Sequence, residues 1–410
     1  MTDFSTLAVH GGYNANRNDD AVSVPIYASA AFDLENAARG RDLAAGEISG
    51  FEYSRVANPT VDALERRLAA LEGGVGAVAV SSGMAAVSYA LMCAGEGGGR
   101  IIAPTNLYGA SVDALGDFLP QFGIHADFVK DINDLHEIES LIGPATRAIF
   151  AETVANPNTA ITDIRPLADL AHRHGLALIL DNTVPTPYLL RPIEFGADIV
   201  VHSTTKGITG HGNAIGGVIV DAGQFDWANG RFLQFTRPEQ VIADIDGNRR
   251  SFSGAFGSEA FIRRIRVKYL RTFGAVQSPF NAYLQLIGLE TAAAGRPPGR
   301  NGDGHRRAPR THAACRVGEL FRVAGLAVSC ARREILPPRR RPDPLVQGGR
   351  RRGPCAPHPR RREAVLIRAK YRRRKVADRR PREHHSPRGA GIVSQGRRCE
   401  RRSDSSVHRS

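Results

Sequence analysis

Two residues of opposite charge lie where a folded chain could bring them to one ligand. Asp181 follows an apolar run of five residues, and Lys206 follows a second apolar run through a short polar segment. Both runs read as buried strands, and residues just past the carboxyl ends of parallel strands line the ligand crevice of an open sheet. An acid can pair with a protonated pyridine nitrogen and an amine can form an imine with an aldehyde, which is the chemistry of pyridoxal phosphate. The ordinary alternatives are a helix-capping or loop acid and a solvated loop lysine.

Hydroxyl and glycine residues near these two supply the groups that a phosphate needs. Ser203 and Thr205 flank Lys206 at spacings that allow both hydroxyls to donate to phosphate oxygens. Gly83 and Met84 follow another predicted strand and open a predicted helix, where free backbone N–H groups bind anions. A plain strand-to-helix turn is the alternative for this second segment.

Several further residues could surround a planar cofactor. Tyr108 follows the next strand and could lay its ring over the cofactor. Tyr53 and Arg55 precede the sheet, and a guanidinium beside a phenol suits a phosphate dianion. Glu152 and Asn156 end a strand and enter a turn. Each of these residues could instead be an ordinary core, surface or turn residue.

The elements that must position these residues form an alternating pattern. Helical stretches separate most of the short apolar runs GAVAVSS, RIIAP, HADFV, RAIFAET, LALILDN, DIVVHS and IGGVIV. Such alternation predicts an α/β domain with a mostly parallel seven-stranded sheet over 76–220. Helices are predicted from Val61 to the glycines at 73–74, over 163–174, and over much of 255–290. Residues 1–50 show no strong period and read as an arm.

The net charge of +14 is the sum of two parts of the chain that carry opposite net charge. Residues 1–290 carry 22 Lys and Arg against 32 Asp and Glu, a balance of −10, and residues 291–410 carry the remaining 33 against 9, a balance of +24. The chain has no apolar run long enough for a membrane span and no signal-like start, so we expect a cytoplasmic protein. Its five cysteines have neither metal-site nor disulfide-framework spacing, and no metal is expected.

Six stretches together resemble the Cys/Met-metabolism family of pyridoxal-phosphate enzymes, which has the aspartate-aminotransferase fold (fold type I). They are YSRVANPT, SSGMAA, NLYGAS, ETVANPN, LILDNT and HSTTKGITGHG, in the order of the family and at about its spacing. The later run GGVIVDAGQFDWANGRF looks most like the O-acetylhomoserine sulfhydrylase branch. The resemblance implies pyridoxal 5'-phosphate as cofactor.

The resemblance also implies roles for individual residues. Lys206 would be the Schiff-base lysine and proton shuttle, with Asp181 on the pyridine nitrogen and Tyr108 stacked on the ring. Phosphate ligands would be Gly83, Met84, Ser203 and Thr205, and Asn156 would contact the ring with Glu152 nearby. Tyr53 and Arg55 would reach the phosphate in a neighbouring subunit, which implies a homodimer or homotetramer.

The implied reaction is γ-replacement on O-acetyl-L-homoserine. Sulfide or a thiol would displace acetate and give L-homocysteine or a thioether, as in methionine and cysteine biosynthesis. A cystathionine γ-synthase and a methionine γ-lyase type of C–S lyase share the early steps and stay open as alternatives. The substrate would be a small amino acid. We expect no membrane partner, and we favour the absence of a nucleic-acid partner.

Two features depart from the family pattern. Gly207 follows Lys206 where relatives usually carry an aromatic residue, and we expect only looser local packing from this change. Beyond residue 290 no Arg-Leu/Phe-Ser-Val/Ile-Gly segment provides the arginine that binds the substrate carboxylate. An out-of-frame translation after about Thr291 explains the Arg/Pro-rich composition, and a basic nucleic-acid-binding tail on an inactive remnant is the competing hypothesis.

The sequence thus predicts four parts. Residues 1–58 form an arm that contacts a neighbouring subunit, and residues 59–250 form the cofactor-binding α/β domain. Residues 251–290 form a helical connection to a small domain. Residues 291–410 form an atypical tail, and the small domain itself is expected to be absent or disordered.

Overall fold

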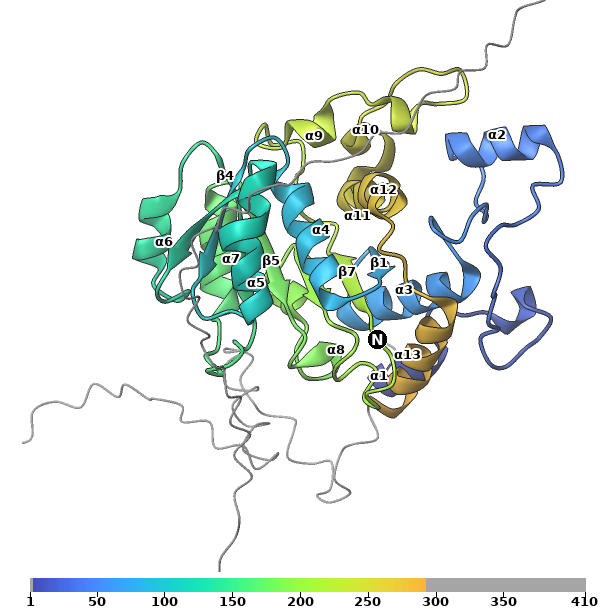
Figure 1. The fold of residues 1–410 in the computed structure, drawn as a ribbon, viewed down its shortest axis with the longest axis horizontal. Helices are drawn as coiled ribbons and strands as arrows, with labels where there is room; N and C mark the ends of the chain where they lie inside the picture. Colours follow the sequence, from blue (N-terminus) through green and yellow to red (C-terminus); the bar gives the residue numbers. More distant parts are fainter. Residues whose placement is uncertain (1–2, 293–410) are drawn as a thin grey trace, which may run out of the picture. The chain divides into compact units, whose positions relative to one another are not determined.

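The computed structural model describes residues 3–292, and its centre is a seven-stranded sheet (Figure 1). The strands run in the order β1-β7-β6-β5-β4-β2-β3. Their bounds are β1 Gly76–Val80, β2 Arg100–Pro104, β3 His125–Val129, β4 Thr146–Glu152, β5 Ala177–Asp181, β6 Ile199–His202 and β7 Gly217–Asp221. All seven coincide with the apolar runs from which strands were predicted.

Most neighbouring strands of the sheet are parallel. The pairs β2–β3, β2–β4, β4–β5 and β5–β6 are parallel, whereas β7 is antiparallel to both β1 and β6. Parallel neighbours place their carboxyl ends at one edge, and in the β4–β5 register Glu152 lies opposite Asp181. The predicted α/β fold with a mostly parallel sheet is confirmed.

The central strands are largely apolar because both faces of the sheet are covered, whereas the edge strand β3 carries His125 and Asp127 and is mostly not buried. Successive residues of β1 alternate between two hydrophobic clusters: Ala77 and Ala79 belong to one, and Val78 and Val80 to the other. The first cluster includes side chains of α3, α7 and α13, and the second includes those of α4 and α11.

The helices begin and end largely where the sequence signals lie. Their bounds are α1 Phe4–His10, α2 Ala37–Ala45, α3 Pro59–Glu72, α4 Gly83–Gly95, α5 Gly109–Asp113, α6 Leu135–Leu141, α7 Ile164–Arg173, α8 Thr186–Leu189, α9 Leu233–Thr236, α10 Phe252–Phe256, α11 Ala260–Arg264, α12 Arg271–Phe273 and α13 Pro279–Ala292. In α3, Asn58 caps the first turn, Pro59 takes the first position, and Gly73 ends the helix with a left-handed φ of 87°. Helix α7 lies within the predicted 163–174.

The first fifty residues contain two helices that the sequence did not predict. Helix α1 packs against α3 and α13, where Ala8 is buried (Figure 1). Helix α2 is capped by Asn36 at its start and by Gly46, with a φ of 77°, at its end. These two stretches are therefore helical although the sequence shows no strong period there.

Residues 252–292 are largely helical, as predicted. Helices α10, α11 and α12 follow one another with 3-10 and π turns between them, and α13 covers the expected FNAYLQLIGLE segment. The tail hypotheses and the expected small domain concern residues beyond 292 and lie outside the described residues. None of the helices described here has the length and apolar character that a membrane crossing requires.

Candidate cofactor site

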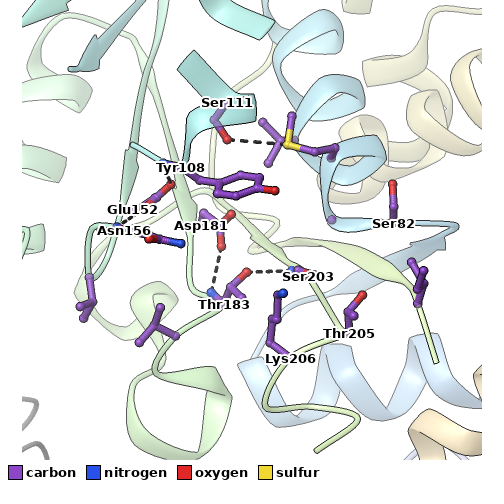
Figure 2. Close-up of a pocket in the computed structure, with 16 residues that line it drawn as sticks. Ser82, Tyr108, Ser111, Glu152, Asn156, Asp181, Thr183, Ser203, Thr205 and Lys206 are labelled. Carbon is purple, nitrogen blue, oxygen red and sulfur yellow. Dashed lines mark hydrogen bonds between the residues drawn. The ribbon is translucent and has the colours of Figure 1, made fainter. Parts of the chain in front are cut away.

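A cavity of about 270 Å³ lies at the carboxyl edge of the parallel strands (Figure 2). Its lining includes eight of the ten residues predicted to hold a cofactor: Gly83, Met84, Tyr108, Asn156, Asp181, Ser203, Thr205 and Lys206. These residues come from segments more than 120 positions apart in the chain. The fold therefore gathers residues that the sequence alone could only place at separate strand ends.

Asp181 ends β5 and lines the inner part of the cavity. The backbone N–H of Thr183 donates to its Oδ1 at 2.9 Å. Burial raises the pKa of the Asp181 carboxyl, while hydrogen bonds from Thr183 and attraction by His202 lower it. One side of the carboxylate faces the cavity although the group lies deep in the protein. A cationic group placed in the cavity would favour the ionised carboxylate.

Lys206 belongs to a turn that follows β6. Its backbone N–H bonds to Ser203 O at 3.2 Å, and the backbone N–H of Ser203 donates to Thr183 Oγ1 at 2.8 Å. In Figure 2 the Lys206 amine points from its turn toward the part of the cavity where Asp181 and the Tyr108 ring lie. The Thr205 hydroxyl donates to Gly216 O at 3.2 Å and accepts from Gly216 N at 3.1 Å, so this residue also fixes the loop.

The first turn of α4 forms one wall of the cavity. Ser82 Oγ caps the helix by accepting from Ala85 N at 3.1 Å, but the N–H groups of Gly83 and Met84 have no acceptor within residues 3–292. Position 83 requires glycine because a Cβ there would lie 2.5 Å from Ser203 Cβ. This close approach places two free N–H groups beside the Ser203 hydroxyl, which is an arrangement suited to a phosphate.

Glu152 joins the two loops at the far side of the cavity. Its carboxylate accepts from Tyr108 N at 2.6 Å and from Asn156 N at 2.7 Å. Burial raises the pKa of Glu152 to about 7; the two backbone bonds act in the opposite direction, and the neighbouring Asp181 raises it further. The Tyr108 ring is about half exposed and faces the cavity (Figure 2).

Tyr53 and Arg55 do not line this cavity. The Arg55 guanidinium lies 5.3 Å from the centre of the Tyr53 ring and donates to the backbone oxygen of Arg271. Tyr53 is 43% exposed. Within one chain the structure thus does not bring these two residues together with the other eight.

The expectation of loose packing at Gly207 is wrong. A Cβ at this position would lie 2.8 Å from Thr186 Cγ2, so the backbone and the Thr186 methyl group already approach closely. Thr186 itself has a left-handed φ of 60°. An aromatic residue after Lys206 would require Thr186 and its turn to move.

Sequence reasoning missed two polar residues of the cavity. Thr183 lines the wall and connects Asp181 to the Ser203 backbone, and Ser111 donates to Met84 Sδ at 3.8 Å. The position of Thr183, two residues after Asp181, was the available signal. Ser111 lies inside α5 and gave no signal of its own.

The donor set fits pyridoxal phosphate. A primary amine and a carboxylate line the same cavity, and two unbonded N–H groups at a helix start stand beside a serine hydroxyl without an acceptor among the described residues. The amine, the carboxylate and the N–H groups match the aldehyde, the protonated ring nitrogen and the phosphate of the cofactor, respectively. The described residues hold no cluster of His, Cys, Asp and Glu suited to a metal ion.

Comparison with known proteins gives a consistent result. The family model of the Cys/Met metabolism PLP-dependent enzymes matches residues 5–294. A sulfhydrylase of Fusarium oxysporum is 44% identical over 289 residues, which are 70% of this chain and 66% of that protein. An O-acetyl-L-homoserine sulfhydrylase of Leptospira meyeri is 40% identical over 291 residues, 70% of this chain and 65% of that protein. The chain thus spans slightly less than two thirds of the length of these relatives.

A solved structure has the same fold. It is described as an O-acetylhomoserine (thiol)-lyase of Campylobacter jejuni with N'-pyridoxyl-lysine-5'-monophosphate, and it superposes with a TM-score of 0.67 at 36% identity, covering 72% of each chain. The predicted cofactor and fold type are confirmed by the family and by this neighbour. From the cavity and from these comparisons we conclude that the chain belongs to the Cys/Met metabolism family of PLP-dependent enzymes.

Proposed function

We propose that the protein catalyses γ-replacement on O-acetyl-L-homoserine, with sulfide or a thiol as nucleophile and acetate as leaving group. The observation that carries the proposal is the convergence of Lys206 and Asp181 on one cavity whose wall is a helix start with two N–H groups that have no acceptor among the described residues. The names of the relatives support this substrate, since two of those compared are O-acetylhomoserine enzymes.

Each residue has a task in this proposal. Bound pyridoxal phosphate would supply an aldehyde that holds the amino acid and a protonated ring that withdraws electrons from its Cα. Lys206 would hold the cofactor at rest and then move the proton at Cα. Asp181 would keep the ring nitrogen protonated, and Tyr108 would cover the ring. These roles fit the positions that the three side chains have around the cavity.

The remaining site residues would bind and orient. Gly83, Met84 and Ser203 would donate to the phosphate, and Thr205 would hold its loop against Gly216. Asn156 would contact the ring from the loop that Glu152 fixes. Replacement of acetate by sulfide needs no oxidant, because a C–S bond forms at Cγ where the C–O bond breaks. Hydrogen sulfide keeps one proton on the product thiol and releases the other with the acetate.

We propose a homodimer or homotetramer in which Tyr53 and Arg55 complete the cavity of a neighbouring subunit. Their absence from the lining of the cavity in their own chain supports this role, as does the exposed ring of Tyr53. The assembly would make 1–58 a contact arm, 59–250 the cofactor domain and 251–290 the helical connection. A cytoplasmic location belongs to the same proposal, and the buried free thiol of Cys93 is compatible with it.

The decisive experiment supplies the full-length protein with O-acetyl-L-homoserine and sulfide and measures homocysteine and acetate. Cysteine as nucleophile tests cystathionine synthesis, and release of a 2-keto acid from methionine or homocysteine tests C–S lysis. The matched control is Lys206→Arg, which keeps the positive charge but should lose turnover. Equal homocysteine formation by the control, or dominant keto-acid release by the wild-type chain, would contradict the proposal.

A further inference from the structure

A strained residue lies in the segment that joins β5 to β6. Thr186 has a φ of 60°, which is left-handed backbone, although its side chain is branched at Cβ. A β-branched residue rarely adopts this conformation, and such strain persists where the surrounding structure fixes it, often at functional sites. The strained residue belongs to the segment 182–190, whose Thr183 and Val184 line the cofactor cavity.

Contacts within the segment hold Thr186 in this conformation. Its N–H donates to Asn182 O at 3.0 Å, and its carbonyl accepts from Leu190 N at 3.2 Å. Asn182 Nδ2 also donates to Leu190 O at 2.8 Å, so the two ends of the segment are bonded to each other. The buried Pro185 and Pro187 on either side each have a fixed φ. The segment therefore has little freedom to relax the strained backbone.

The side chain of Thr186 contacts the turn that carries Lys206. Its hydroxyl accepts from Tyr188 N at 3.4 Å, while its methyl carbon Cγ2 lies against Gly207, the residue after Lys206. A Cβ at Gly207 would lie 2.8 Å from this methyl carbon, so the methyl group packs on the main chain of the turn.

A second contact fixes the same turn from α13. A Cβ at Gly288 would lie 2.6 Å from Ile208 O and 2.4 Å from Thr209 O, so the helix and the turn approach backbone to backbone. The turn is closed by Gly210 N, which donates to Lys206 O at 2.8 Å. Because the residues after Gly207 are held by the helix, the methyl contact determines how the start of the turn, and with it the amine, can lie.

We propose that Thr186 is a positioning residue that holds the Lys206 turn so that the amine stays directed into the cofactor cavity. Thr186 itself does not line the cavity, so it acts through the main chain of Gly207 and Lys206. The role rests on the proposed function of Lys206, whereas the contact between the two segments does not depend on that function.

The test uses two variants that separate the two groups of the Thr186 side chain. Thr186→Ser keeps the hydroxyl and loses the methyl group, whereas Thr186→Val keeps the methyl group and loses the hydroxyl. The first readout is hydrogen exchange of the peptide 206–210 in the full-length chain freed of cofactor. We expect exchange to be about three- to tenfold faster in Thr186→Ser, the factor for one buried methyl group, and unchanged in Thr186→Val. The dissociation constant of pyridoxal phosphate, from absorbance titration, should rise in Thr186→Ser alone.

The matched control is Thr159→Ser. Thr159 has a φ of 57° in an exposed turn, so this variant makes the same substitution at the same kind of backbone away from Lys206. Both readouts should equal those of the wild type.

A second variant, Gly207→Ala, approaches the contact from the other residue. Its Cβ would meet the Thr186 methyl group, so it should weaken cofactor binding more in the wild-type background than in the Thr186→Ser background. Wild-type exchange of 206–210 in Thr186→Ser, or additive effects of the two substitutions, would overturn the inference. A wild-type chain that forms no imine with pyridoxal phosphate would contradict the proposed function of Lys206 and, with it, the positioning role.

Discussion

Replacing Glu152 by glutamine should change how the stability of the protein depends on pH. In the wild type the Glu152 carboxyl is 6% exposed and its pKa is raised to about 7 by burial, from an ordinary value of 4.5. A raised pKa means that the folded state binds this proton more tightly than the unfolded state. The contribution of Glu152 to stability is therefore full below pH 4.5 and falls as pH rises toward 7. The glutamine amide of the variant would not titrate at all.

The size of the effect follows from the two pKa values. The difference between about 7 and 4.5, at 1.36 kcal/mol for each pH unit, corresponds to about 3 kcal/mol of unfolding free energy. The variant also loses an oxygen acceptor for one of the two N–H groups, those of Tyr108 and Asn156, because its own NH₂ would face one of them. This second loss lowers stability at every pH, so it shifts the curve of the variant without adding a slope.

The assay is urea unfolding of the cofactor-free full-length chain from pH 5 to pH 8. The difference in free energy between wild type and Glu152→Gln should fall by about 2–3 kcal/mol over this range and then level off. Titrating groups that do not interact with Glu152 contribute equally to both proteins and cancel, whereas the neighbouring Asp181 is coupled to it. Parallel curves with a constant offset would refute the reasoning, because they would mean that Glu152 has an ordinary pKa in the folded protein.

Three further outcomes test the site. Lys206→Arg should retain the fold and lose turnover by about 10²–10⁴-fold, measured as homocysteine formation, while normal turnover would exclude Lys206 as proton carrier. Gly83→Ala places a Cβ 2.5 Å from Ser203 Cβ, and we expect about 1–3 kcal/mol of lost stability together with weaker cofactor binding. Equal mixing of Arg55→Ala and Lys206→Ala chains, each inactive alone, should restore about a quarter of wild-type activity if dimers exchange subunits and share sites; no recovery after verified exchange would argue against Arg55 acting across the interface.

The strands of the sheet could be predicted from sequence because each one is marked by its own short apolar run. Strands buried on both faces are uniformly apolar, and in β5 the run ends abruptly at Asp181. The ends of α3 and α7 could be predicted for the same reason, since Asn58, Gly73 and Gly175 act within one turn of each helix end. Such signals need no knowledge of the rest of the fold.

The features that the sequence did not reveal depend on distant contacts. Helix α1 has seven residues and is held by α3 and α13, so its stability comes from packing that no local pattern records. The bonds of Glu152 to two loops, and the pairing of Glu72 with His202 across 130 positions, exist only once the strands are side by side. The same holds for Gly207, whose contact with Thr186 reversed the expectation of loose packing.

The position of β7 has a consequence for the order of events during synthesis. It lies between β1 and β6, so β1 has no strand partner in the sheet until residues 217–221 have left the ribosome. The two halves of the phosphate cradle, at 82–84 and 203–205, flank this last strand and are brought together through it. A chain stopped before Gly217 would expose the apolar β1 and carry no assembled cradle, whereas one stopped soon after α13 would have every segment of the cavity.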